Sequence, residues 1–339
     1  MKICICGGGN LGHVLAGFVA AHTNHEVCLM TRHPERWHKS ITVKRPDSWL
    51  PLIGTPACIS SDPAEVVAGA DVVIMCLPGF SIHEVLLQIK DYVKPEAVVG
   101  SVVSSTGFFF EAMNILPPTQ PLFGLQRVPF IARTIEYGHV AAIMGYKDSL
   151  AIAVEQTCRD EEIRQLSESL FNTPTKLLGS FYEVSLSNSN PLLHPSRLYS
   201  LWKDWKEGDV FSHVPLFYEE WTEEAAQLYI NMDNELQTLL TQLPVRKGSI
   251  PTVLEYYESH DAASLAQKLR SIEAFKGIKA PMKEVEGGYV PDFQSRYFTE
   301  DFPYGLAIVH RLTKEKGIAS PTIDTIWEWG TKMLSAYSQ

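Results

Sequence analysis

The stretch "KICICGGGNLGHVLAGFVAAH", residues 2–22, decides the fold of the N-terminal half. It opens with a short run of β-prone side chains, and three glycines follow that run directly. In the segment after the glycines, apolar residues recur at helical spacing, which predicts a helix with one inward face. These residues are Leu11, Val14, Leu15, Phe18 and Val19. We therefore predict a strand, a tight glycine turn and a helix in immediate succession.

The glycines of this turn follow the G-x-G-x-x-G pattern with Gly7, Gly9 and Gly12. Gly7 permits the tight turn, Gly9 lets a pyrophosphate approach the backbone, and Gly12 lets the helix pack close to the strand. The amides at the start of the helix then face the phosphates. The position between a strand and a helix favours a dinucleotide site. We expect its contacts to come from Gly7, Gly8, Gly9, Asn10, Leu11 and Gly12.

Apolar and amphipathic segments alternate after this unit. We expect strands in "HEVCLM", "DVVIMCL", "AVVGSVV" and "HVAAIMG", and a helix in "SIHEVLLQIKDYV". This order is typical of a parallel sheet that helices cover on both faces. The predicted fold class is therefore α/β. A Rossmann-type doubly wound sheet occupies residues 1–182, and an all-α domain that holds the substrate follows over residues 183–339.

The helical half is predicted from four amphipathic segments that come after the strand rhythm stops. They are "EEWTEEAAQLYINMDNELQTLLTQL", "DAASLAQKLRSIEAF", "PYGLAIVHRLTKEKG" and "PTIDTIWEWGTKMLSAY". A nucleotide-binding domain joined to a helical domain is typical of a dehydrogenase, and we expect its substrate between the two.

The end of the second predicted strand indicates the cofactor. An NAD site usually carries Asp or Glu there, bonded to the ribose 2′-hydroxyl. In "HEVCLMTRHPERW" the acidic residue comes too early, and Arg32 stands near the end of the strand. A guanidinium suits a 2′-phosphate, with Thr31 and Arg36 as helpers. NADP is therefore favoured over NAD. Pro78 and Gly79, at the carboxyl end of a later strand, are expected beside the nicotinamide-side ribose.

Composition excludes several other classes of protein. The formal net charge of −10 argues against nucleic acid or an anionic membrane as a partner. No run of about 18 apolar residues could span a bilayer, and the first residues leave no room for a signal peptide. The six cysteines form no CxxC pair, so we expect reduced packing residues, no metal site and a cytoplasmic location.

Two polar clusters stand out in the helical half. In "NSNPLLHP", Asn190 and His194 are four residues apart and share one face if the segment is a helix, with Asn190 as its cap. In "QSRYFTEDFPYG", Arg296 and Asp301 lie among aromatic residues. From the residue types alone, the second cluster is either a site or a structural ion network.

These segments give the chain a resemblance to a known family. "NSNPLLHP" and "RYFTEDFPYGL" resemble the opine dehydrogenases of the octopine and nopaline type, and "FGLQRVPFIAR" resembles their Gln-x-x-Pro segment. With the glycine pattern, the likeness runs from residue 3 to about residue 325. It implies an NAD(P)-dependent oxidoreductase acting on CH–NH groups. Such an enzyme condenses an amino acid with a 2-oxo acid and reduces the imine to a secondary amine dicarboxylate.

The resemblance also implies roles for particular residues. The catalytic histidine falls on His194, its partner on Asp301 and the arginine that binds the oxo acid on Arg296, while Asn190 and Gln126 line the substrate site. The residue types suit this chemistry. Histidine shuttles protons near neutral pH, a carboxylate behind the ring fixes its tautomer, and arginine clamps a carboxylate through two parallel hydrogen bonds.

Two other interpretations stay open. A ketopantoate-reductase-like or 3-hydroxyacid dehydrogenase would place a lysine in the helical domain, where Lys203 and Lys206 are the nearby candidates. A non-catalytic NADP-sensing protein could use the same two domains. The sequence does not identify the amino acid, the 2-oxo acid or the oligomeric state, for which a homodimer is the candidate.

Overall fold

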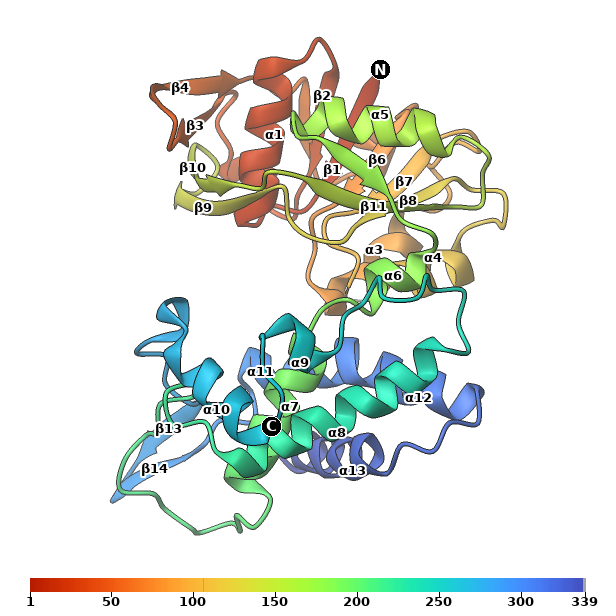
Figure 1. Ribbon diagram of the computed structural model, residues 1–339. Coiled ribbons are helices and arrows are strands. Elements are labelled where there is room, and N and C mark those ends of the chain that lie inside the picture. The colour runs from red at the N-terminus through yellow and green to blue at the C-terminus, as the bar shows by residue number, and fades with distance from the viewer. Residues whose placement is uncertain (106, 338–339) are drawn as a thin grey trace. The chain divides into compact units, whose positions relative to one another are not determined.

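The computed structural model describes residues 1–105 and 107–337, drawn as a ribbon in Figure 1. Its contacts divide the chain into two compact units, Met1–Ser187 and Asn188–Gln339. The sequence had placed this division after residue 182. No helix in the described part of the chain is long and apolar enough to cross a membrane.

The first unit is built on an eight-stranded sheet in the order β12-β11-β8-β7-β6-β1-β2-β5. Its strands are β1 (Lys2–Cys6), β2 (Glu26–Met30), β5 (Cys58–Ser60), β6 (Val72–Met75), β7 (Val98–Ser101), β8 (Leu122–Leu125), β11 (Leu150–Glu155) and β12 (Thr175–Leu177). Neighbouring strands are parallel, except that β11 runs antiparallel to β8. A strand hairpin, not a crossover helix, joins β8 to β11, and this connection lets the chain return in the opposite direction. The sequence had predicted a parallel sheet, and the β11–β8 pair is its antiparallel exception.

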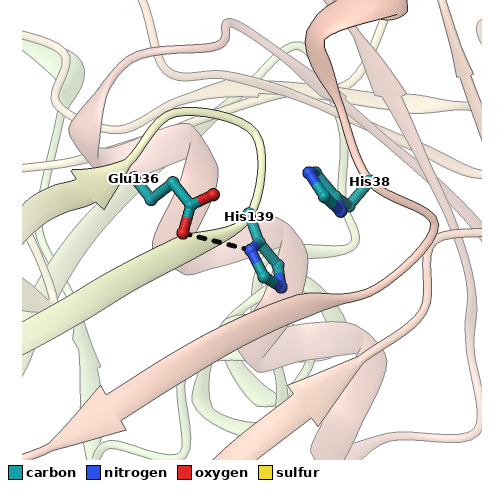
Figure 2. A group of neighbouring side chains, drawn as sticks. All are labelled: His38, Glu136 and His139. Carbon is teal, nitrogen blue, oxygen red and sulfur yellow. Dashed lines mark ion pairs between the residues drawn. The ribbon is translucent and has the colours of Figure 1, made fainter.

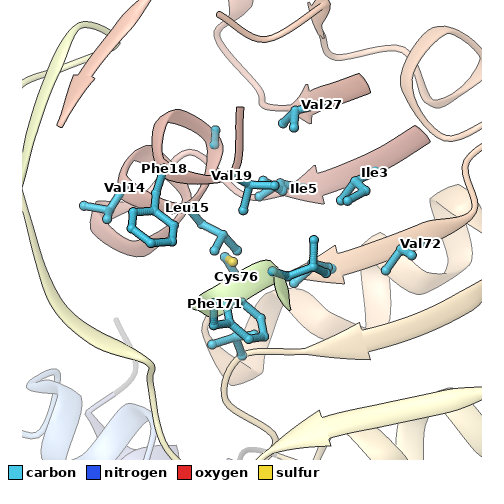
Figure 3. Packing of buried hydrophobic residues seen from close by; sticks show 14 of the residues in the cluster. Ile3, Ile5, Val14, Leu15, Phe18, Val19, Val27, Val72, Cys76 and Phe171 are labelled. Carbon is cyan, nitrogen blue, oxygen red and sulfur yellow. The ribbon is translucent and has the colours of Figure 1, made fainter. Parts of the chain in front are cut away.

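Helices cover both faces of this sheet, as predicted for a doubly wound fold. Side chains alternate along β1, so that Ile3 and Ile5 pack in one core while Cys4 and Cys6 pack in the other. The first core includes α1 (Asn10–His22) and α5 (Asp160–Phe171), and Figure 3 shows part of it. The second includes α2 (Pro63–Val66), α3 (Gly79–Ile89) and α4 (Phe108–Ile115). All six cysteines are free thiols, as expected.

A second, four-stranded sheet in the order β4-β3-β10-β9 packs beside α1. Its strands are β3 (Ile41–Arg45), β4 (Ser48–Gly54), β9 (Phe130–Glu136) and β10 (Val140–Tyr146), and the short helix η1 (Pro34–Arg36) precedes it. The predicted strand "HVAAIMG" is β10 and therefore belongs to this sheet. The β9–β10 turn lies near the glycine turn that follows β1, and His13 connects the two turns.

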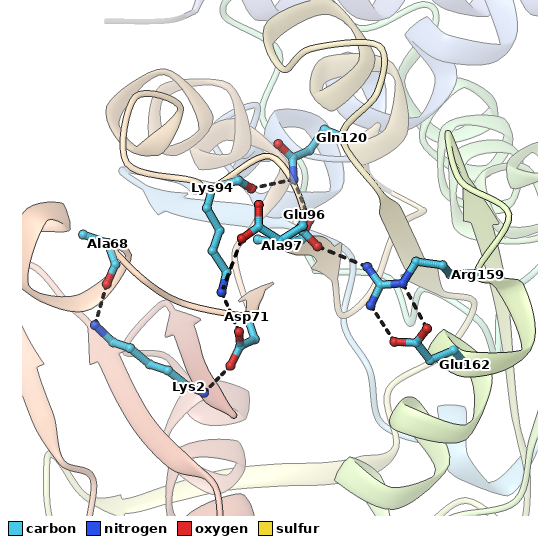
Figure 4. Close-up of polar contacts among 9 residues, drawn as sticks. All are labelled: Lys2, Ala68, Asp71, Lys94, Glu96, Ala97, Gln120, Arg159 and Glu162. Carbon is cyan, nitrogen blue, oxygen red and sulfur yellow. Dashed lines mark hydrogen bonds and ion pairs between the residues drawn. The ribbon is translucent and has the colours of Figure 1, made fainter.

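Polar contacts tie the strands together at the amino edge of the main sheet (Figure 4). The backbone N–H of Lys2 donates to the Asp71 carboxylate over 2.7 Å, and Lys94 Nζ donates to the other carboxylate oxygen over 2.6 Å. The hydrogen bond from Lys94 lowers the pKa of Asp71. Because β1 begins at this edge, its glycine turn lies at the opposite, carboxyl edge.

The second unit is mainly helical, as predicted. Its helices are α7 (Asn190–Trp202), α8 (Glu223–Leu240), α9 (Val253–Tyr256), α10 (Ala262–Ser271), η2 (Glu273–Phe275), α11 (Arg296–Thr299), the π-helix η3 (Phe302–Leu306), α12 (Ala307–Glu315) and α13 (Pro321–Ala336). The short α6 (Phe181–Ser185) precedes it in the first unit. The second unit is not all-α as predicted, because it also holds a hairpin of β13 (Met282–Val285) and β14 (Gly288–Pro291) and two isolated β-bridges. Helix α7 packs against α8, η3 and α13.

Candidate active site and cofactor groove

The glycine turn after β1 has the close contacts that its sequence pattern predicts. Gly7 has a positive φ of 125°, and a Cβ atom there would lie 2.4 Å from the Cys76 carbonyl oxygen. A Cβ on Gly12 would lie 1.8 Å from the Gly7 carbonyl oxygen, so only glycine lets α1 start this close to the strand. A Cβ on Gly9 would meet nothing within 4 Å. Protein packing therefore does not require Gly9, whereas a phosphate approaching the backbone would use that open space.

This turn forms one wall of a groove with a volume of about 610 Å³ in the first unit. Five of the predicted cofactor residues line it: Gly7, Gly8, Gly9, Arg32 and Pro78. The other four begin the flanking helices: Asn10, Leu11 and Gly12 in α1, and Gly79 in α3. The size of the groove and the open glycine backbone fit a dinucleotide.

Two arginines and a threonine stand in the groove after β2. Arg32 and Thr31 follow the strand directly, and Arg36 lies over the ring of Tyr137 with its Cζ 4.3 Å from the ring centre. Tyr137 also lines the groove and comes from the β9–β10 turn. Glu84 of α3 is the one acidic residue among the residues that line this groove.

His13 also belongs to this region, although it was not predicted as a site residue. The backbone N–H of Gly138 donates to Nε2 over 2.7 Å, so the neutral ring carries its proton on Nδ1, which donates to the Gly9 carbonyl over 2.9 Å. Its ring also stacks on Trp37 at 4.0 Å, and burial lowers the pKa of His13. His13 therefore links the glycine turn to the β9–β10 turn. Its partner Gly138 lies far along the chain, so no local pattern could have revealed the link.

Gln126 follows β8 at the carboxyl edge of the main sheet. Because β8 is parallel to β7, this is the same edge that carries the glycine turn. Its side-chain Nε2 donates to the Glu183 carbonyl over 3.4 Å, a long hydrogen bond. That edge is where ligands bind in open α/β sheets.

In the second unit, His194 lies between an acid and a phenol. Its Nδ1 is 2.7 Å from Asp301 Oδ2, and its Nε2 is 2.9 Å from the Tyr218 hydroxyl. A carboxylate accepts, so the proton of a neutral ring sits on Nδ1, and Nε2 then accepts from Tyr218. Burial raises the pKa of Tyr218 well above its ordinary value, which keeps the phenol protonated. This arrangement fixes one tautomer of His194.

Local chain geometry brings His194 and Asp301 together. Pro191 stands in the first turn of α7, where its missing N–H costs nothing. The sequence predicted Asn190 as the cap, but Ser189 occupies that position and Asn190 is the first helical residue. A Cβ on Gly305 would lie 2.7 Å from Pro191 Cγ, so a glycine in η3 lets the two helices approach closely.

Aromatic rings enclose the His194 ring, which is 7% exposed. Tyr297 meets it edge-on at 4.6 Å and Phe217 at 5.8 Å, while the ring of Tyr218 stacks on Phe275 at 4.0 Å. The apolar surroundings strengthen the polar contacts of the ring because water is excluded. Tyr218 was not predicted as a site residue, and its contacts with His194 in α7 and Phe275 in η2 span 24 and 57 positions of the chain.

Arg296 lies at the start of α11, next to Tyr297, and its guanidinium pairs with Glu300. Nε donates to Oε1 over 2.9 Å and Nη2 to Oε2 over 2.7 Å, a side-on pair in which the arginine side chain is 81% exposed. The structural ion pair, one of the two roles that the sequence allowed for this cluster, is therefore observed. The Glu300 side chain is only 19% exposed, so the pair is open to solvent on the arginine side alone. Asn190 is partly exposed, one helical turn before His194.

The lysines of the alternative interpretation lie elsewhere. Lys203 Nζ pairs with Glu224 at the start of α8, and the backbone N–H of Lys206 donates to Asp209 over 2.9 Å. Neither lysine contacts His194 or Asp301 in the described part of the chain.

Comparisons with known proteins show which enzymes this chain resembles. The family model of the NAD/NADP octopine/nopaline dehydrogenase α-helical domain matches residues 177–334. The model of the NAD-dependent glycerol-3-phosphate dehydrogenase N-terminus matches residues 2–115. A tauropine dehydrogenase of Arabella iricolor is 29% identical, over 98% of this chain and 91% of its own length. Residues 177–334 thus match the helical domain of the octopine/nopaline dehydrogenases, and the chain is similar to opine dehydrogenases over nearly its whole length.

An octopine dehydrogenase of Pecten maximus is 27% identical to this opine dehydrogenase homologue, over 98% of this chain and 90% of its own length. The solved structure of an octopine dehydrogenase with NADH and L-arginine superposes with a TM-score of 0.88 at 27% identity. It covers 99% of this chain and 90% of the other chain. The predicted resemblance and fold class are thus confirmed, and this opine dehydrogenase homologue is an NAD(P)-dependent oxidoreductase of the CH–NH class. The description of the matching helical-domain model covers both NAD and NADP.

Proposed function

We propose that this chain joins the amino group of an amino acid to a 2-oxo acid and reduces the resulting imine at the His194 cluster. Condensation forms the C=N bond and releases water. Reduction then adds a hydride, which NADPH or NADH supplies, to the imine carbon, and a proton goes to nitrogen. The products are a secondary amine dicarboxylate and the oxidised cofactor. The observation that carries this proposal is the position of His194 between Asp301 and Tyr218.

In this proposal Nε2 of the neutral His194 ring first accepts a proton, which makes the ring an imidazolium, and then donates that proton to the substrate. Asp301 keeps Nδ1 protonated and stabilises the imidazolium when the ring takes up a second proton. Because Nδ1 is paired with Asp301, Nε2 is the ring nitrogen that can contact the substrate. In this structure Nε2 accepts a hydrogen bond from the Tyr218 hydroxyl. A substrate oxygen that takes the place of that hydroxyl would receive the proton over the same short distance.

Arg296 is proposed to bind the carboxylate of the 2-oxo acid. Its fork already holds one carboxylate side-on, that of Glu300, so the geometry suits such a ligand. The exchange of Glu300 for substrate would keep the guanidinium paired. Tyr297, the next residue, contacts the His194 ring, which supports a position near the reacting atoms. Asn190 and Gln126 are proposed to contact the same substrates.

NADP is proposed as the preferred cofactor. Arg32 and Thr31 stand at the end of β2, where an NAD site carries an acidic residue, and Arg36 adds a second guanidinium to the same groove. Two guanidinium groups and a hydroxyl are suitable donors for a 2′-phosphate.

A homodimer and a cytoplasmic location also stay predictions. Exposed apolar side chains gather on the second sheet, and the most exposed are Trp49, Ile53, Ile135 and Met144. A homodimer would bury a surface of this kind. Size-exclusion chromatography with light scattering at several protein concentrations decides the oligomeric state.

The assay for the proposed function is a matrix of 2-oxo acids against amino acids that follows NADPH absorbance. The proposal expects oxidation that needs both substrates in at least one combination. Oxidation that depends on the 2-oxo acid alone would favour a hydroxyacid dehydrogenase. No oxidation with intact cofactor binding would favour the NADP-sensing alternative.

A further inference from the structure

We infer that His38, Glu136 and His139 form a binding site for a divalent transition metal ion such as Zn²⁺. The three side chains face one another beside the β9–β10 turn of the first unit (Figure 2). One donor atom from each lies within 4.8 Å of the others. The site lies outside the proposed catalytic cluster, and its occupancy does not depend on the proposed function.

The donor set selects the class of ion. Two imidazole nitrogens and one carboxylate oxygen are ligands of Zn²⁺ sites with three protein ligands and one open position. Imidazole also suits Cu²⁺ and Ni²⁺, whereas Mg²⁺ and Ca²⁺ prefer oxygen ligands throughout. Donors about 2.1 Å from a tetrahedral metal lie roughly 3.4 Å apart, so the widest separation in this group, which is at most 4.8 Å, would have to shorten by about an ångström.

His139 supplies a second indication of a missing ligand. Its Nδ1 is shielded from solvent and makes no hydrogen bond to any described residue. Glu136 Oε2 faces this nitrogen at 3.2 Å but outside hydrogen-bond geometry. A buried polar atom without a hydrogen bond is costly, and a metal ion between the nitrogen and the carboxylate would satisfy both groups.

The ring of His38 must turn for the site to close. The His38 and His139 rings are stacked with centroids 4.2 Å apart and planes at 13°, so their in-plane lone pairs run nearly parallel. A metal needs lone pairs that converge. His38 is exposed, which leaves room for rotation about its Cα–Cβ bond.

The backbone around the three residues is already fixed. The N–H of His38 donates to the Gly138 carbonyl over 2.9 Å, and the N–H of Thr42 donates to the His139 carbonyl over 2.8 Å. The N–H of His139 donates to the Glu136 carbonyl over 3.1 Å, which closes the turn. Metal binding would therefore restrict the three side chains but not the backbone. The loss of conformational entropy on binding is smaller for this reason.

This site was not predicted from the sequence. The expectation of no metal rested on cysteine spacing, whereas these ligands are two histidines and a glutamate from segments far apart in the chain. The backbone hydrogen bonds between those segments bring them together.

The test is isothermal titration of the full chain with Zn²⁺ alone, repeated for His38→Ala, Glu136→Gln and His139→Ala. The matched control is His260→Ala, which removes an exposed histidine that faces one carboxylate, Asp261, at 3.7 Å. We expect one saturable site in the unmodified chain and in the control, weakened roughly tenfold or more in each ligand variant.

Equal Zn²⁺ affinity in the ligand variants and the control, or no saturable binding by the unmodified chain, would overturn the inference. Circular dichroism melting without metal checks that each variant is folded. Because Glu136→Gln preserves size and the backbone turn, it keeps the test valid if a histidine variant fails to fold. The visible absorption of bound Co²⁺ gives an independent readout. Co²⁺ in a tetrahedral protein site absorbs more strongly than the octahedral aqueous ion, so binding should raise the absorbance.

Discussion

The Nδ1 atom of His194 lies 2.7 Å from Oδ2 of Asp301, although 107 residues separate the two in the chain. The pair joins α7 to the residue just before η3, and the close contact of Gly305 with Pro191 permits that approach. With Tyr218 on Nε2, one ring contacts an acid, a phenol and several aromatic side chains. The catalytic proposal depends on this arrangement.

Loss of either member of the pair should impair turnover. His194→Gln should lower kcat by roughly 10²–10⁴-fold, because the amide cannot exchange the proton. Asp301→Asn should also lower kcat, since an amide does not hold the Nδ1–H tautomer as a carboxylate does. The double variant should be little worse than the worse single one, because the pair acts as one unit.

Steady-state kinetics measures these losses, with NADPH binding and melting temperature as controls for folding. Independent losses that multiply in the double variant would show that the two side chains act separately. Unchanged turnover in His194→Gln would remove this residue from the mechanism.

Arg296→Lys should raise the KM for the 2-oxo acid while NADPH binding stays unchanged. Lysine keeps the positive charge but loses the planar fork that holds a carboxylate through two hydrogen bonds. Initial rates at varied 2-oxo acid measure the effect. An unchanged KM would leave Arg296 with the structural role that its pair with Glu300 already shows.

Arg32→Ala should raise the KM for NADPH far more than the KM for NADH. One charge-assisted hydrogen bond is worth roughly 1.5–3 kcal/mol, or about ten- to a hundredfold in affinity. Parallel titrations of both cofactors measure the difference. Equal use of NADPH and NADH by the unmodified chain would contradict the assigned preference.

The glycine turn was predictable because its requirements are local. Gly7 and Gly12 lie a few residues apart and serve one strand–helix junction, so the spacing alone indicated the contacts. His194 and Asp301 came from the resemblance to a family, because nothing in either segment indicates the other. Tyr218 was missed for the same reason, since its contact with His194 exists only in the folded chain.

The second sheet shows another limit of the sequence. The strand in "HVAAIMG" was predicted, but its apolar pattern cannot say which sheet it joins. Pairing with β9 and β3 is decided by contacts across the fold. The same pairing places Tyr137 and Gly138 beside the glycine turn, and this explains why the role of His13 became visible only in three dimensions.

His13 should make the stability of the chain depend on pH. Burial lowers the pKa of His13 below its ordinary value of 6.5, so the folded state favours the neutral ring. The unfolded chain then binds more protons below pH 6.5, and the stability present above this pH is lost as the pH falls. Urea unfolding at pH 7.5, 6.5 and 5.5, followed by tryptophan fluorescence, measures the loss.

The comparison is with His13→Gln, which does not titrate. This variant should be less stable at pH 7.5 and should change less between pH 7.5 and 5.5 than the unmodified chain. The other histidines titrate in both proteins, so their effects cancel in the difference. Parallel pH profiles for the two proteins would show that His13 is not the group responsible.

The most direct test of reductive condensation is to follow the hydride itself. The unmodified chain is supplied with NADPH that carries deuterium at the transferable position, together with the most active pair of amino acid and 2-oxo acid. Mass spectrometry then identifies the product. The account predicts one deuterium on the carbon of a secondary amine dicarboxylate, and no such product from His194→Gln at a comparable rate. Deuterium in a 2-hydroxy acid, formed equally well without the amino acid, would contradict it.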